Sequence, residues 1–301
     1  MEEEKREVDG GLFVSRSYLV CLSEGIKLPT RHILSLLRFL YPSLSACALT
    51  AALWGVFFNQ MSVAWTQWMD GDGAVALSFL VIMFLLLVLL SMLSGSFYLG
   101  NVMTAVARFA DAGRWPVLRF GSLRREIFRT SLRAFNILLV GQVFKYLVMV
   151  PVVWALGMCS VWTWVAVGGM WLAFGVPYCM TGMDYMLDGR CGFIASLKRM
   201  KDGYRHWTMF FIILFCSGLL VEMLVVVAWL PAAILSYAGH ESFVGVLAGD
   251  ATDLPSYIPA LTVLFFMLAA VLTCIFRWLV YFPLAFLYGS LEARRCEKAF
   301  F

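Results

Sequence analysis

The chain has 301 residues, of which 62% are hydrophobic and 14% are charged, and its formal net charge is +4. Soluble domains are about 45–50% apolar and about 25% charged, so a chain of this length could not cover so much apolar surface with a polar exterior. The composition also excludes a disordered chain and a collagen-like repeat, because low hydrophobicity and strict glycine periodicity are missing. We therefore expect a membrane protein.

Six apolar stretches are long enough to cross a bilayer, because a helix needs about 20 mostly apolar residues to cross about 30 Å of hydrocarbon. They are 33–58, 74–99, 134–157, 159–180, 207–234 and 258–288. Helices satisfy every backbone amide inside lipid, and such long apolar blocks do not fit the alternating strands of a β-barrel. The sequence thus predicts an all-α polytopic membrane protein, with an N-terminal segment over 1–32, a six-helix membrane domain over 33–288 and a tail over 289–301.

The basic residues predict the orientation in the membrane. Twenty of the 23 Lys and Arg lie in the N-terminal segment, in the loops after the second and fourth spans, and in the tail. The opposite loops, near 59–73 and 235–257, contain acids and neither Lys nor Arg. Because Lys and Arg accumulate in cytoplasmic loops, we expect both termini to be cytoplasmic. No apolar core precedes residue 33, so no cleaved signal peptide is expected.

The chain repeats a pattern weakly. Tyr98–Asp111 followed by Gly113-Arg114 corresponds, at a shift of 76, to Pro177–Asp188 followed by Gly189-Arg190. A basic stretch and an apolar span follow each copy, and the region from Tyr18 is a fainter third copy. The predicted unit is an interfacial amphipathic segment, a glycine break, a basic helix and a membrane hairpin, and three parallel units make six spans. Inverted repeats are more usual in secondary transporters, so this pattern favours a transporter less without excluding one.

One pattern in the chain consists of Tyr98-Leu99-Gly100, Ala112-Gly113 and Pro116, followed by a basic helix and a span. It is repeated from Tyr185 through Gly203. The repeated pattern resembles that of a loose superfamily of bacterial polytopic membrane proteins. That superfamily includes the membrane-anchor domain of some glycerophosphodiester phosphodiesterases. Its closing span is similar to Tyr281-Phe282-Pro283 with Tyr288. The resemblance covers about residues 12–290 and implies a six-helix membrane domain in a bacterial cytoplasmic (inner) membrane. We expect no phosphodiesterase activity, because the sequence ends eleven residues after Ser290 and holds no such catalytic domain.

The strongest local signal is the Arg-rich stretch 119–133. Read as a helix from about Ser122, it has one broad apolar arc, formed by Leu123, Ile127, Phe128, Leu132 and Phe135. At the membrane interface its arginines would face anionic head groups, and each base near such a surface contributes on the order of 1 kcal/mol. The candidates for contact with lipid or a partner protein are Arg119, Arg124, Arg125, Arg129 and Arg133. Alternatively, these arginines only determine topology.

Four ionisable residues fall inside the predicted spans, namely Arg38, Lys145, Glu222 and Arg277. Charges at mid-bilayer cost at least about 2.5–3.5 kcal/mol each, so they usually face the protein interior and pair, whereas Arg38 lies near enough to the edge to snorkel. At about 1.5 Å per residue the other three lie at similar depths, so we hypothesise that Glu222 is the counter-ion of Lys145 or Arg277. This intramembrane charge cluster either lines a path for an anionic or zwitterionic substrate or only locks the helices together.

The sequence offers little for catalysis. The three His are far apart, the eight Cys form no Cys-x-x-Cys pair, and neither a phosphate-binding loop nor a nucleophile elbow is present. We therefore expect no enzyme activity, no metal, no cofactor and no nucleic-acid partner. The predicted function is a non-enzymatic scaffold or accessory component in envelope or lipid homeostasis, whose basic cytoplasmic face engages anionic lipid or a partner membrane protein. The alternative is a small transporter or lipid-moving protein with a path near Lys145, Glu222 and Arg277.

Overall fold

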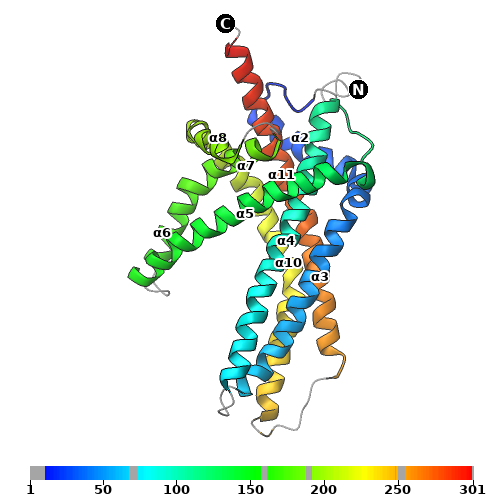
Figure 1. The fold of residues 1–301 in the computed structure, drawn as a ribbon, viewed down its shortest axis with the longest axis vertical. Coiled ribbons are helices and arrows are strands. Elements are labelled where there is room, and N and C mark those ends of the chain that lie inside the picture. Colours follow the sequence, from blue (N-terminus) through cyan, green and yellow to red (C-terminus); the bar gives the residue numbers. More distant parts are fainter. Residues whose placement is uncertain are drawn as a thin grey trace. The chain divides into compact units, whose positions relative to one another are not determined.

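The computed structural model describes residues 11–67, 73–156, 161–187, 192–247, 249 and 255–299 (Figure 1). All regular elements in these ranges are helical. They are α2 (Tyr18–Arg31), α3 (Ile33–Gln67), α4 (Gly73–Ala112), α5 (Phe120–Leu156), α6 (Val161–Met170), the π-helical η2 (Trp171–Gly175), α7 (Val176–Leu187), α8 (Phe193–Lys198), α9 (Met200–Arg205), α10 (Trp207–Leu247) and α11 (Ile258–Ala299).

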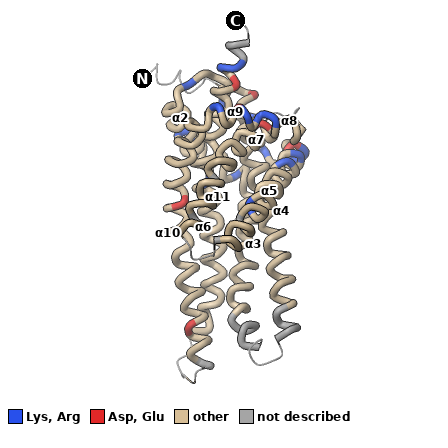
Figure 2. Tube along the Cα trace, turned by 90° about the vertical axis from the view of Figure 1, so that its left-hand side faces the viewer, with Lys and Arg blue, Asp and Glu red and all other residues tan. Residues whose placement is uncertain are grey.

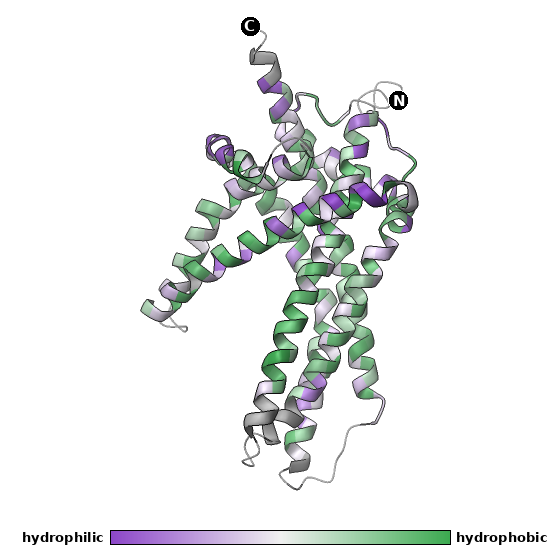
Figure 3. Ribbon diagram, viewed as in Figure 1, coloured by the Kyte–Doolittle hydropathy of each residue, from purple (hydrophilic) through white to green (hydrophobic). Residues whose placement is uncertain are grey.

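Six stretches, on α3, α4, α5, α6 to α7, α10 and α11, are long and apolar enough to cross a membrane. Apolar residues cover most of the length of α3, α4, α10 and α11, whereas polar residues gather on α8 and at the start of α5 (Figure 3). The predictions of an all-α chain and of six apolar spans are therefore confirmed.

Several helices extend beyond the predicted spans. Helix α4 continues from the second span to Ala112, and α11 continues from the sixth to Ala299. The Arg-rich stretch and the third span form the single helix α5, whereas the predicted boundary at residue 134 implied two elements. The physical reason is that no glycine or proline lies between Gly121 and Gly141 to interrupt the helix.

The described chain forms two compact units. Unit 1 comprises Met1–Leu40, Leu99–Val221 and Arg277–Phe301, and unit 2 comprises Tyr41–Tyr98 and Glu222–Phe276. In unit 2, segments of α3, α4, α10 and α11 lie side by side (Figure 1). The indole N–H of Trp54 donates to the Ser91 hydroxyl at 2.8 Å and joins α3 to α4, and that of Trp229 donates to the Thr273 hydroxyl at 2.9 Å and joins α10 to α11. These bonds pair polar groups that hydrocarbon would leave unsatisfied.

Unit 1 contains three positions at which a glycine lets two helices approach closely. A Cβ added to any of these glycines would lie 2.5–3.0 Å from a Cα atom of the facing helix, closer than packed side chains come. The helix pairs are α2 with α11, α4 with α5, and α9 with α7. The facing residues are Gly25 and Pro283, Gly100 and Ser131, and Gly203 and Pro177. Close packing of backbones requires a small residue at these three positions.

The π-helical segment η2 precedes Pro177 in the fourth span. Pro177 has no N–H, so it can donate neither to the carbonyl of residue 173, as in an α-helix, nor to that of Leu172, as in a π-helix. The indole N–H of Trp207, the first residue of α10, donates to the Leu172 carbonyl at 2.9 Å. A side chain of the next span thus satisfies a carbonyl group that the proline leaves open.

Candidate functional site

The Arg-rich part of α5 buries Ile127 and two small residues and exposes two large apolar ones. Ile127, Ser131 and Ala134 are buried, whereas Phe128 is 66% exposed and Leu132 is 52% exposed. Of the predicted apolar arc only Ile127 is buried. Gly100 approaches Ser131 closely, and this backbone contact favours small side chains such as Ser131 and Ala134 on the buried face of α5.

Exposed arginines flank the two exposed apolar side chains. At 3.6 residues per turn, Phe128 and Leu132 lie on an arc with Arg124 on one side and Arg125 and Arg129 on the other. All three arginines are exposed. We call these five residues the α5 ridge. Figure 2 shows Lys and Arg gathered on the α5, α8 and α9 part of unit 1.

The remaining charged residues of this stretch have local partners or lie outside the ridge. Arg119 is exposed just before α5 begins. Arg133 points to α7: its Nη1 donates to the Tyr185 carbonyl at 3.1 Å, and its guanidinium lies 5.3 Å from the centre of the Tyr185 ring. The carboxylate of Glu126 pairs with Arg108 of α4, with 2.9 Å between Arg108 Nε and Glu126 Oε2. Arg133 therefore packs helices together.

The predicted intramembrane charge cluster consists of three exposed side chains. Lys145 on α5 and Arg277 on α11 belong to unit 1, and Glu222 on α10 is the first residue of its segment of unit 2. The pairing of Glu222 with a base stays a prediction, and a loss of thermal stability in Glu222→Gln is its test.

Sequence reasoning missed a buried charge network in unit 1. Asp184 of α7 is fully buried, and its Oδ1 accepts from Arg199 Nη1 in an ion pair. The Tyr288 hydroxyl of α11 donates to the same oxygen at 3.0 Å. Arg199 Nη2 also lies 3.5 Å from Glu292 Oε2, one turn beyond Tyr288 on α11. Since Arg199 stands at the junction of α8 and α9, the Asp184 network joins α7 and this junction to α11, which is distant in the sequence.

Electrostatics keep the Arg199 guanidinium charged. Burial alone would lower the pKa of the Arg199 guanidinium, but the adjacent Asp184 and Glu292 carboxylates outweigh burial and raise this pKa above its usual range. An isolated buried carboxylate is costly, whereas one that pairs with an arginine and accepts a hydroxyl hydrogen bond is tolerated. The arrangement fixes α7, α9 and α11 to one another.

Two signals could have indicated this network. Asp184 is the one acid in the mostly apolar stretch 176–186, and a lone acid in such a stretch needs a partner if the stretch is buried. Tyr288 and Glu292 are spaced by four residues, so they share a helix face.

The structure shows no site for a metal among the described residues: no three His, Cys, Asp or Glu lie close enough together to hold an ion. Comparison with known proteins finds no matching family model, no matching curated protein and no matching solved structure. The resemblance to the membrane-anchor superfamily therefore stays a prediction, and function has to be inferred from this chain's own residues.

Proposed function

We propose that the chain is a non-enzymatic multi-pass membrane protein, a scaffold or accessory component in envelope or lipid homeostasis, and that its α5 ridge binds anionic lipid head groups. The observation that carries this proposal is the exposure of Phe128 and Leu132 between three exposed arginines. A helix at a membrane interface buries its apolar side chains about 5–10 Å into the boundary region and directs its bases to the phosphates.

The alternative, that the arginines only determine topology, explains the charges but not the two apolar side chains. Burying a large apolar side chain contributes about 1.5–3 kcal/mol, and each arginine near an anionic surface adds on the order of 1 kcal/mol. Arginine stems can extend from the apolar level to the head groups, so both kinds of side chain are satisfied by one lipid surface.

We also propose that both termini lie on the cytoplasmic side of a bacterial inner membrane and that the chain consists of three parallel repeats. The close approaches in unit 1 support the repeats. Each joins the helix that leads into one predicted hairpin to the last span of another: α2 to α11, α5 to α4, and α9 to α7. The helix before the second hairpin contacts the last span of the first hairpin, and the helix before the third hairpin contacts the last span of the second. The helix before the first hairpin contacts the last span of the third.

We expect the triple variant Arg124→Gln, Arg125→Gln, Arg129→Gln to lose most of its preference for anionic lipid. Three head-group contacts at on the order of 1 kcal/mol each predict a drop of at least about tenfold in the enrichment of phosphatidylglycerol over phosphatidylcholine. The measurement is the lipid that co-purifies with the protein from a bilayer containing equal amounts of both.

The matched control removes three charges elsewhere in unit 1, with the exposed residues Lys198, Lys201 and Arg205 changed to Gln. This variant should retain the enrichment. Equal enrichment in the wild type and the α5 variant, or an equal loss in the control, would contradict the proposal.

A further inference from the structure

In unit 1, residues 12–16, which precede α2, pack against the C-terminal turns of α11 and hydrogen-bond to them. Leu12 is buried at a notch made by Gly289, where an added Cβ would lie 2.9 Å from the Leu12 carbonyl carbon. The Ser290 hydroxyl accepts from the Arg16 N–H at 2.8 Å and donates to the Arg16 carbonyl at 3.0 Å. Arg294 donates to the same carbonyl through Nη2. The backbone at Arg16 is thereby held above the last turns of α11.

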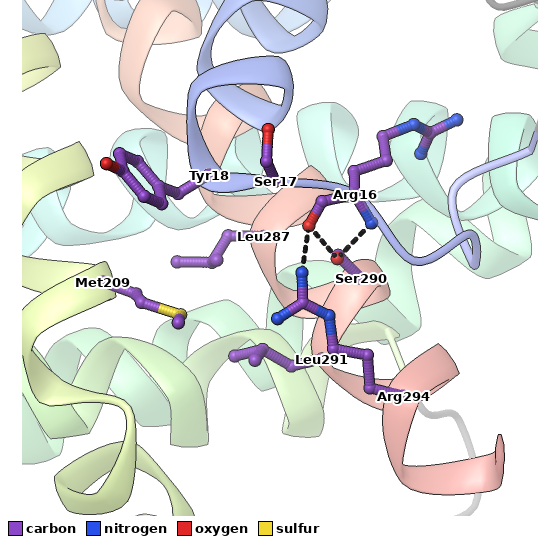
Figure 4. Close-up of a pocket in the computed structure, with 8 residues that line it drawn as sticks. All are labelled: Arg16, Ser17, Tyr18, Met209, Leu287, Ser290, Leu291 and Arg294. Atoms are coloured by element: carbon purple, nitrogen blue, oxygen red, sulfur yellow. Dashed lines mark hydrogen bonds between the residues drawn. The ribbon is translucent and has the colours of Figure 1, made fainter.

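A pocket of about 140 Å³ lies beside this segment (Figure 4). It is lined by Arg16, Ser17, Tyr18, Met209, Leu287, Ser290, Leu291 and Arg294, none of which is acidic. Leu287, Leu291 and Met209 line it with apolar atoms, and the Arg294 guanidinium, which also lines it, points to the Arg16 carbonyl (Figure 4). A dry cavity of about 150 Å³ lined by apolar side chains can hold a molecule the size of benzene, so this pocket can take the first part of an acyl chain.

The pocket lies where two candidate spans end. Met209 is on the first turn of the span in α10, and Leu291 and Arg294 are on the last turn of the span in α11. Head groups occupy the zone just outside the hydrocarbon, so an arginine at the end of a span meets phosphates while the residues one turn deeper meet acyl chains.

The charge balance around the pocket favours an anion. Arg294 lines the pocket, and none of the lining residues is acidic. The first turn of α2, which begins at the pocket, contains no acid, so its backbone dipole adds positive potential. A bound phosphate would offset positive charge at this place.

We propose that this pocket binds a single anionic phospholipid, with the phosphate at Arg294 and the start of one acyl chain over Met209, Leu287 and Leu291. The charge of Arg294 and the apolar lining together match a lipid, whereas free phosphate would use only the charge. The site is separate from the α5 ridge and does not depend on it.

The test titrates short-chain phosphatidylglycerol into the full-length protein in neutral detergent and follows binding by native mass spectrometry. Two further arms use phosphatidylcholine and inorganic phosphate. Arg294→Gln should weaken phosphatidylglycerol binding by about tenfold or more. Met209→Trp should abolish it by filling the pocket while leaving the hydrogen bonds of Arg16 and Ser290 in place.

The matched control is Arg295→Gln, which removes the same charge one residue further on and outside the pocket. Arg295→Gln and the α5 triple variant should both bind as the wild type does, which separates this site from the α5 ridge. The proposal would be overturned if phosphatidylcholine or inorganic phosphate bound as tightly as phosphatidylglycerol does. It would also be overturned if Met209→Trp bound phosphatidylglycerol with wild-type affinity.

Discussion

Asp184→Asn is expected to lower the free energy of unfolding by about 2–3 kcal/mol. Removing one member of a fully buried ion pair costs about 3–5 kcal/mol, because the other charge is left without a partner in a low dielectric. Arg199 is 24% exposed, so water recovers part of that cost. The Tyr288 hydroxyl also loses a charged acceptor and keeps a neutral one, which weakens its hydrogen bond. The measurement is reversible unfolding of the purified protein in mixed micelles.

A double-mutant cycle separates the ion pair from general disruption. Arg199→Gln should also destabilise the protein, and the double variant Asp184→Asn with Arg199→Gln should cost clearly less than the sum. The matched control is Asp202→Asn, which breaks the exposed pair with Arg295 and should cost less than about 1 kcal/mol. An Asp184→Asn variant no less stable than Asp202→Asn would show that the network does not hold unit 1 together.

Gly25→Ala is expected to cost about 3 kcal/mol or to prevent accumulation of folded protein. The added Cβ would lie 2.5 Å from both Cα and N of Pro283, and backbone atoms cannot rotate away as the tip of a flexible side chain can. Overpacking usually costs about 1–3 kcal/mol, and a contact with a helix backbone belongs at the upper end of that range. Gly203→Ala, with 3.0 Å to Pro177 Cα, should cost less. Thermal unfolding in detergent measures the relative stability of the two variants.

The matched control for this series is Gly218→Ala in α10, where nothing lies within 4 Å of the added Cβ. Because alanine is the better helix former by up to about 1 kcal/mol, this variant should be as stable as the wild type or more stable. If Gly25→Ala and Gly218→Ala unfolded at the same temperature, the close packing of α2 on α11 would not contribute to stability.

The sequence was sufficient for the spans because their length and composition are fixed by the bilayer. The predicted spans end at 99 and 288, whereas the helices α4 and α11 continue to Ala112 and Ala299. Polar residues end an apolar span without ending the helix. A helix ends at a glycine, a proline or a capping residue.

The candidate sites were predicted only in part. The arginines of the α5 ridge are a local pattern, and the sequence identified them. Which side of α5 is buried depends on Gly100 of another helix, so the pattern within α5 does not indicate it. Asp184 meets Arg199 across 15 positions and Tyr288 across 104, and no periodicity within one helix indicates such partners. The contact of Gly25 with Pro283 is likewise a tertiary feature.

The orientation of the six spans can be measured with a membrane-impermeant maleimide on intact cells. Variants that each carry one cysteine would be made in a background from which the eight native cysteines are removed. The positions are Val117, between α4 and α5, and Tyr257, just before α11, which are 85% and 62% exposed. We expect the cysteine of Tyr257→Cys to react in intact cells, and that of Val117→Cys to react only after the membrane is permeabilised. Labelling of Val117→Cys in intact cells would contradict both the cytoplasmic position of the α5 ridge and the proposed function that depends on it.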